Sequence, residues 1–149
     1  MDDVTLREYR QGDLDAMYAL DVECFEAEFR FSRRAMRGFA EARGAISVLA
    51  ESEGELAGFC VVQVEDQVAY VATLDVAAPW RRKGLARRLM AVIEAKARAA
   101  GARAMALHVF TDNRPAIRLY EAIGYGQAGV AEDFYGSDRD ALVYGKQLE

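Results

Sequence analysis

Apolar residues recur along the chain with two different periods, which predicts a series of strands and helices. Alternation with a period of two predicts strands over residues 4–10, 46–51, 56–64, 68–76, 105–110, 128–135 and 141–147. A spacing of three to four residues predicts helices over 14–22, 32–39, 84–100 and 113–123. The order β-α-α-β-β-β-α-β-α-β-β indicates an α/β (α+β) fold, with one mixed, mostly antiparallel sheet of about seven strands and helices on both faces.

Residues that favour caps and turns lie at the boundaries of these elements. Asp13, Ser32 and Asn113 each precede a predicted helix, where a short polar side chain accepts a hydrogen bond from a free backbone N–H group. Polar turns at 52–54 and 65–66 separate three consecutive strands. These three strands are therefore expected to form an antiparallel meander.

Composition and charge narrow the classes of protein. With 149 residues and no linker or repeat, the chain is expected to be a single domain over 1–149. The net charge of −5 argues against nucleic acid as a partner, and no apolar stretch approaches the roughly 20 residues of a membrane span. Asp2 and Asp3 give an acidic start that is untypical of a secretory signal, so a cytoplasmic protein is expected. Cys24 and Cys60 are expected to be reduced core residues, and a chain with one histidine is expected to bind no metal.

Basic residues crowd around the predicted start of the third helix. A helix start carries a partial positive charge and free N–H groups, so cations there are unfavourable unless an anion is bound. Gly84 would let the backbone approach such a ligand closely. A solvated basic face is the alternative, but the pattern favours a site for a polyanion built from five cations, Arg81, Arg82, Lys83, Arg87 and Arg88.

Two separated motifs resemble the GNAT superfamily of N-acetyltransferases. Arg81-x-x-Gly84-x-Ala86 resembles the pyrophosphate loop of that family, and Asn113-x-x-Ala116-x-x-Leu119-Tyr120-x-x-x-Gly124-Tyr125 resembles its second cofactor motif. Each motif lies where a strand passes into a helix, and both occur in the expected order. The resemblance covers nearly the whole chain and extends to the bacterial ribosomal-protein-alanine N-acetyltransferases and the eukaryotic N-terminal acetyltransferases.

The resemblance implies acetyl-CoA as co-substrate and assigns residues to bind it. Leu74 and Val76 would pair through their main chain with the pantetheine arm. Asn113 would contact the cofactor as well as cap its helix. The pyrophosphate would lie on the segment Arg81, Arg82, Lys83, Gly84, Leu85, Ala86 and Arg87.

Three residues match positions of catalytic groups in the family. Tyr120 matches the proton donor for the departing thiolate, although a buried core tyrosine is the alternative. His108 departs from the glutamate of the ribosomal-protein branch and matches the histidine of a eukaryotic branch, in which it acts with a tyrosine through an ordered water. Tyr70 occupies that tyrosine position, so a Tyr70/His108 water relay is the predicted base, with a purely structural pair as the alternative.

The acceptor is expected to be the α-amine of a protein or peptide N-terminus. Tyr135 lies where the family places a tyrosine against the peptide, and Phe25 and Glu26 lie in an ordered loop, 24–31, that would form the opposite wall. A small amine, such as a polyamine, an amino acid or an antibiotic, is the alternative acceptor. A CoA-binding module without catalysis is a third possibility. The partners would be acetyl-CoA and the acceptor alone, for a monomer or homodimer.

Overall fold

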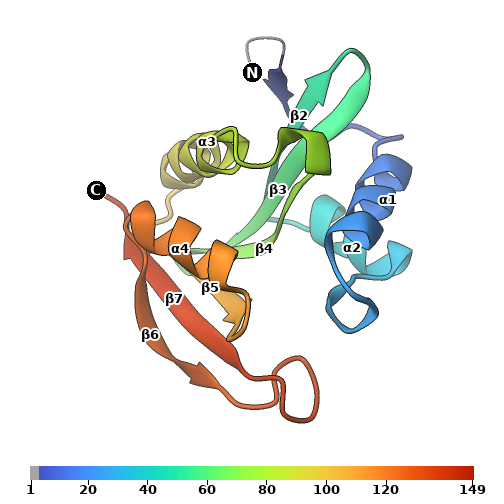
Figure 1. Ribbon diagram of the computed structural model, residues 1–149. Helices are drawn as coiled ribbons and strands as arrows, with labels where there is room; N and C mark the ends of the chain where they lie inside the picture. The colour runs from blue at the N-terminus through green and yellow to red at the C-terminus, as the bar shows by residue number, and fades with distance from the viewer. Residues whose placement is uncertain (1–3) are drawn as a thin grey trace.

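The computed structural model describes residues 4 to 149, which form one seven-stranded sheet with helices on both faces (Figure 1). The strand order is β1-β2-β3-β4-β5-β7-β6, and only the β4–β5 pair is parallel. The predicted mixed sheet and element order are therefore confirmed. The strands are β1 (Thr5–Arg7), β2 (Ala45–Ser52), β3 (Glu55–Glu65), β4 (Val68–Val76), β5 (Ala104–Phe110), β6 (Gly126–Ala131) and β7 (Ala141–Gln147).

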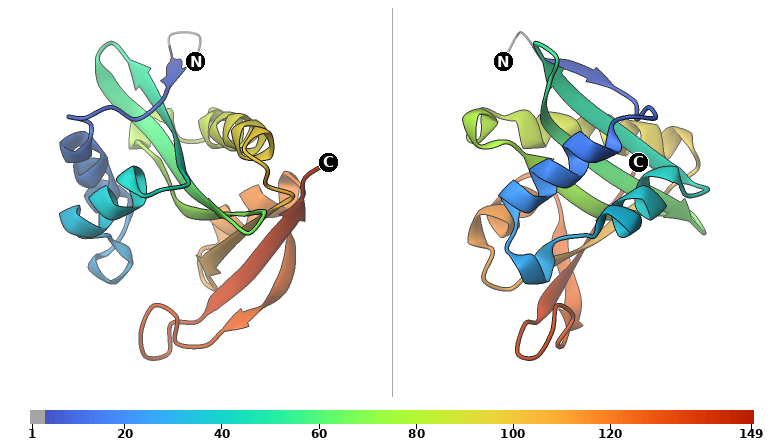
Figure 2. Two further views of the ribbon diagram at one scale, coloured as in Figure 1. Left: turned by 180° about the vertical axis from the view of Figure 1, so that it is seen from behind. Right: turned by 90° about the vertical axis from the view of Figure 1, so that its right-hand side faces the viewer.

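Helices cover the two faces of the sheet in pairs (Figure 2). Helices α1 (Leu14–Cys24) and α2 (Arg33–Glu41) pack on one face, and α3 (Leu85–Ala99) and α4 (Arg114–Ala122) pack on the other. Strand β3 contributes to both cores, because Phe59 and Val61 face α1 whereas Cys60 and Val62 face α3. Within residues 4 to 149, no helix is long and apolar enough to cross a membrane.

The sheet opens between β4 and β5. The two strands pair only from Val68 to Tyr70, opposite residues 104–106. A bulge at Ala72 follows, since Val62 pairs with Val71 and Val61 already pairs with Thr73. Beyond it β4 stays with β3 and β5 stays with β7. The facing edges of β4 and β5 therefore line an opening near the middle of the sheet.

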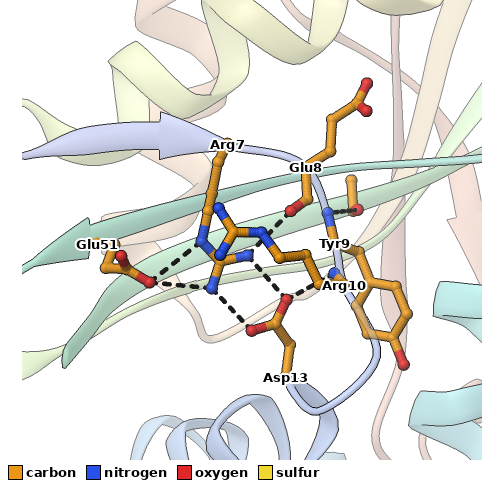
Figure 3. Close-up of polar contacts among 7 residues, drawn as sticks. Arg7, Glu8, Tyr9, Arg10, Asp13 and Glu51 are labelled. Atoms are coloured by element: carbon orange, nitrogen blue, oxygen red, sulfur yellow. Dashed lines mark hydrogen bonds and ion pairs between the residues drawn. The ribbon is translucent and has the colours of Figure 1, made fainter. Parts of the chain in front are cut away.

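Asp13 lies at the start of α1 as predicted, but its side chain does not cap the helix. Its carboxylate accepts no bond from that helix. It binds the Arg7 guanidinium at 2.7 and 2.8 Å and the Arg10 amide at 2.7 Å instead. Arg7 also binds Glu51 at 3.0 Å, so this cluster joins β1, β2 and the start of α1 (Figure 3). The hydrogen bonds from Arg7 lower the pKa of Asp13.

The two strands at the edges of the sheet are shorter than predicted. The first runs only over Thr5–Arg7, and β6 ends at Ala131 where the sequence predicts a strand to residue 135. Residues 132–140 form a loop, in which Asp133 and Asp138 adopt positive φ angles of 52° and 62°. This loop, called here the β6–β7 loop, brings aromatic residues to the opening between β4 and β5.

Candidate active site

The start of α3 presents free backbone amides. Across the described part of the chain, the amides of residues 82–87 have no backbone acceptor, and the first amide bonded within the turn is that of Arg88, to Gly84 O at 3.1 Å. Gly84 has a φ of 83°, a left-handed conformation that glycine adopts without strain. The amides follow η2 (Ala78–Trp80), the short turn that connects β4 to α3. They form a concave set of donors of the kind that binds phosphate.

Cations surround these amides without neutralising partners. All five side chains are exposed, and none forms a salt bridge to a carboxylate of residues 4 to 149: Arg81, Arg82, Lys83, Arg87 and Arg88. Unpaired cations beside free amides disfavour the helix unless an anion is present. The start of α3 therefore fits a polyanionic ligand such as a pyrophosphate.

Arg81 and Cys24 lie on the edge of the opening. Arg81 donates from Nε to the carbonyl oxygen of Val76 at 3.0 Å, and its Nη2 lies 3.6 Å from Cys24 Sγ. Cys24 donates to the same carbonyl at 3.4 Å and is half-buried against the core under α1 and α2. The expectation of a core position therefore holds for Cys60 and only in part for Cys24. Leu74 and Val76 lie on the part of β4 that has no pairing with β5.

Helix α4 places Tyr120 beside the opening. Asn113 caps the helix through a hydrogen bond from the Ala116 amide at 3.3 Å, as predicted. Tyr120 is 8% exposed and packs against Tyr125 with ring centroids 5.7 Å apart. Burial raises the pKa of Tyr120, and the nearby Tyr135 phenol adds to the rise. Its hydroxyl has no hydrogen-bond partner among the described residues, so the proton stays available for donation.

Tyr70 and His108 face each other across the opening. The Tyr70 hydroxyl lies 2.9 Å from His108 Nδ1, so the two predicted members of the relay are in direct contact. Tyr70 is the last residue of β4 that pairs with β5, and His108 follows the paired segment of β5. Burial lowers the pKa of His108 and raises the pKa of Tyr70. Both groups are therefore neutral at physiological pH, and the imidazole is free to accept a proton.

Aromatic side chains form a wall next to this pair. The Phe134 ring stacks on the His108 imidazole, with centroids 4.0 Å apart and planes 5° from parallel. The Tyr135 ring centroid lies 4.9 Å from that of Phe134 and 5.0 Å from that of Phe29. The ring centroids of Phe29 and Phe110 are 4.9 Å apart. Burial raises the pKa of Tyr135 to about 12. The wall, defined as Phe29, Phe110, Phe134 and Tyr135, joins the loop after α1 to the β6–β7 loop.

Comparison with known families bears on this arrangement. The profile of the Acetyltransferase (GNAT) family matches residues 14–125, which include the start of α3, His108 and Tyr120. The chain belongs to the GNAT acetyltransferase family. Within this family, a putative ribosomal protein bS18-alanine N-acetyltransferase of Bacillus subtilis is 24% identical over 139 residues, covering 93% of this chain and 91% of the relative.

Two further GNAT relatives align over shorter stretches. The uncharacterised N-acetyltransferase YycN of Bacillus subtilis is 31% identical over 83 residues, or 53% of each chain. The catalytic subunit ard1 of the N-terminal acetyltransferase A complex of Schizosaccharomyces pombe is 28% identical over 109 residues, covering 68% of this chain. The alignments span about half and three fifths of the lengths of these two relatives, 53% and 62%.

Solved GNAT structures share the fold. The ribosomal-protein-S18-alanine N-acetyltransferase of Escherichia coli superposes with a TM-score of 0.88 at 22% identity, covering 98% of this chain and 94% of that one. NAA60 of Arabidopsis thaliana, solved with a bisubstrate analogue, gives 0.85 at 20% identity, covering 98% and 99%. Nourseothricin acetyltransferase gives 0.80 at 24% identity, with 99% of each chain covered. These likenesses confirm the GNAT fold.

The aromatic wall includes residues that the sequence does not single out. Phe25 and Glu26 take no part in the aromatic contacts described above, and their acceptor roles stay predictions. Phe29 lies in the wall instead, because the turn η1 (Ala27–Phe29) carries it towards Tyr135. Phe110 and Phe134 were not singled out, although Phe110 lies two residues after His108 on the same face of β5 and Phe134 precedes the predicted Tyr135.

Proposed function

We propose that the chain is an acetyl-CoA-dependent N-acetyltransferase acting on the α-amine of a protein or peptide N-terminus. The observation that carries this proposal is the Tyr70–His108 pair, which lies in the opening of the sheet beside the aromatic wall. The names of the bS18-alanine and ard1 relatives support an N-terminal acceptor. We expect the acceptor amine to approach from the side of the wall and the acetyl donor from the side of α3.

The residues at the start of α3 fit acetyl-CoA, which supplies the acetyl group as a reactive thioester when bound. The free amides of 82–87 would bind the pyrophosphate, and the exposed cations around them would neutralise its charge. Asn113, at the first turn of α4, is the second predicted contact. The unpaired edge of β4 at Leu74 and Val76 would bind the pantetheine arm by adding to the sheet.

His108 would act as the general base. In the tautomer that protonates Nδ1, His108 donates to the Tyr70 oxygen and Nε2 keeps a lone pair for the proton of the amine, directly or through an ordered water. Its lowered pKa keeps the imidazole neutral at pH 7. An α-amine with a pKa of about 8 is freed of its proton at pH 7 for about 1.4 kcal/mol, whereas a lysine amine requires about 4.6 kcal/mol. A weak base therefore suits the N-terminal amine better.

Tyr120 would donate a hydrogen bond to the departing thiolate. Its raised pKa means that the phenol stays protonated, and its hydroxyl has no competing acceptor among the described residues. A buried neutral donor stabilises developing negative charge more strongly than one in water. Tyr120 would thus lower the barrier for cleavage of the thioester.

A small amine is the second candidate acceptor. Nourseothricin acetyltransferase, whose name specifies an antibiotic substrate, shares the fold over 99% of this chain. The cofactor-binding residues would serve either acceptor equally. The difference would lie in the aromatic wall, where Tyr135 and Phe29 would contact the residues that follow an N-terminal amine in a peptide.

Acetyl transfer to a peptide panel tests the proposal. Peptides that vary in their first two residues would be compared with N-terminally blocked peptides containing lysine and with a panel of small amines, all with acetyl-CoA. We expect mass spectrometry to find acetylation confined to free α-amines. Turnover restricted to small amines would favour the second candidate, and acetyl-CoA binding without turnover of any amine would favour a module without catalysis.

A further inference from the structure

Two carboxyl groups are buried against each other between α1 and β4. Asp21 on α1 is 0% exposed and Asp75 on β4 is 1% exposed. Helix α1 packs on β4, and the Asp21 carboxyl acts on the pKa of Asp75 as a hydrogen-bonding neighbour. Asp21 Oδ1 and Asp75 Oδ2 are buried and accept no hydrogen bond from any donor in the described part of the chain. Buried carboxylates are normally paired with cations, so this arrangement requires an explanation.

Among residues 4 to 149, the surroundings supply neutral donors, and no cation forms a salt bridge or hydrogen bond with either carboxyl group. Asp21 Oδ2 accepts the Phe31 amide at 2.9 Å, and Asp75 Oδ1 accepts the Thr73 hydroxyl. Arg81, on the connection that follows β4, contacts the Val76 carbonyl and Cys24 instead. Three other titratable groups interact electrostatically with Asp75, and none of them is a cation. They are the thiol of Cys24 on α1, the thiol of Cys60 on β3 and the phenol of Tyr120 on α4.

Two ionised carboxylates would repel strongly in this position. Low local polarisability strengthens the repulsion, and each charge would also lack solvation. One proton removes the repulsion, and the one remaining charge is stabilised because the carboxylic acid donates a hydrogen bond to the neighbouring carboxylate. Consistent with this, burial and the hydrogen bond with Asp21 raise the pKa of Asp75 well above its ordinary value.

The pair connects the two sides of the candidate site. Through Phe31, Asp21 fixes the end of the loop 25–32, which carries Phe29 to the aromatic wall. Asp75 lies on β4 between Leu74 and Val76, the residues expected to bind the pantetheine arm. Any change in the distance between the two carboxyl groups would therefore move the loop 25–32 relative to β4.

We propose that Asp21 and Asp75 share a single proton and act as positioning residues, holding the loop 25–32 against β4 so that the acceptor site keeps its shape. This inference rests on the proposed function only in calling that site the acceptor site. Neither residue is assigned a direct part in the chemistry. The pair would hold the loop while it carries one proton and release it when that proton is lost at alkaline pH.

The sign of the pH dependence follows from the direction of the shift. The folded protein keeps a proton on Asp75 that the unfolded chain loses above its ordinary pKa of 3.8. Folding therefore binds a proton, and the contribution of the pair is present at low pH and decreases as the pH rises towards the folded pKa. Asp75→Asn supplies a permanent donor to Asp21 and an acceptor for Thr73, so the variant would lack this decrease.

Thermal unfolding between pH 5 and pH 9 tests the proposal without any acceptor. We expect Asp75→Asn to melt at least about 3 °C above the natural protein at pH 9, and to show little difference or a lower melting temperature at pH 5. Asp21→Asn removes the other carboxyl group of the pair, so its melting temperature should also vary less with pH than that of the natural protein. The exposed Asp66→Asn, in the turn between β3 and β4, is the matched control and should follow the natural protein. Parallel curves for all four proteins would overturn the proposal.

Hydrogen exchange at the Phe31 amide reports on the loop itself. In the natural protein the protection factor of this amide should fall at least tenfold between pH 6 and pH 9, whereas in Asp75→Asn it should stay constant. Unchanged protection in the natural protein would show that the pair does not hold the loop. If an acceptor is identified, its KM should rise at alkaline pH in the natural protein and not in Asp75→Asn, with the KM for acetyl-CoA equal in both. The unfolding and exchange experiments keep their meaning even if the acceptor proves to be a small amine.

Discussion

The two sides of the opening between β4 and β5 are built in opposite ways. On the α3 side, free amides and exposed cations come from one continuous segment, residues 81–88. On the other side, aromatic rings come from the loop after α1, from β5 and from the β6–β7 loop. A ligand common to a whole family can be bound by one local motif, whereas the aromatic wall depends on the packing of distant segments.

A third set of residues lies between these two sides, at the opening itself. Tyr70, His108 and Tyr120 lie where the strands separate, and their hydroxyl and imidazole groups are neutral at physiological pH. Substitutions here should reduce turnover with every acceptor. Substitutions on the α3 side should alter the KM for acetyl-CoA, and those in the aromatic wall should alter the KM for the acceptor.

Tyr120→Phe should have the largest effect. It removes the donor to the thiolate while keeping the buried ring, so kcat should fall by about 10²–10³-fold. The KM for acetyl-CoA and the melting temperature should change little. Steady-state kinetics with a saturating acceptor would measure the effect. An unaltered kcat would show that Tyr120 is a core residue only.

His108→Ala should reduce kcat by about 10²-fold near neutral pH. Because burial lowers the pKa of His108 below its ordinary value of 6.5, the imidazole of the natural protein stays mostly neutral as the pH falls to 6.5. The ratio of natural to variant rates should therefore be largest near neutral pH and shrink as the pH falls well below 6.5. A ratio independent of pH would contradict the assignment as base. Tyr70→Phe, which removes the partner of Nδ1, should show a smaller loss with the same dependence on pH.

Removing two cations from the α3 side should weaken acetyl-CoA binding without altering turnover. Arg82→Ala combined with Arg87→Ala should raise the KM for acetyl-CoA about tenfold, since two charge-assisted contacts would be lost. The effect should diminish at high salt because exposed charges are screened. Arg34→Ala, an exposed cation on α2, is the control. Equal effects of the two changes would mean that the basic segment is a solvated surface.

Truncating the aromatic wall should have the smallest effect and a different signature. Tyr135→Ala removes the contacts with Phe29 and Phe134, so the acceptor KM should rise by about three- to tenfold. The KM for acetyl-CoA should remain the same. Phe25→Ala, outside the aromatic contacts of the wall, should change the acceptor KM less. A larger effect at Phe25 than at Tyr135 would support the acceptor role predicted for Phe25 from the sequence.

The sequence predicted the central elements well because their periodicity is strong. Strand β3 has apolar residues on both faces, and every second residue of β4 is buried. The turns before and after β3 contain acidic residues, with a glycine in the first. The edge strands were predicted too long, since β6 is mostly exposed and contains two glycines among six residues. At Asp13 the local signal for a cap was correct in place, but Arg7 competes for the carboxylate. Local patterns do not reveal such a partner.

The candidate site was predictable only where it is local. The segment 81–88 and the cap at Asn113 are readable because the residues follow one another in the chain. Which phenylalanine of the loop 24–31 reaches the site depends on the turn at Ala27–Phe29 and on contact with Tyr135, more than a hundred residues later. The Asp21–Asp75 pair gives no sequence signal either, because each residue alone is an ordinary acid within a helix or a strand.

The opening between β4 and β5 also gives the sheet two interior edges. Exposed strand edges can recruit a strand from another chain, and proteins normally shield them with charge or with covering segments. Here Arg81 covers one carbonyl of the β4 edge, at Val76, and leaves the remainder to be covered by a bound ligand. An extended ligand arm seated there would therefore protect the folded chain from self-association, so the concentration of cofactor would influence how long the protein survives in solution as well as how fast it works.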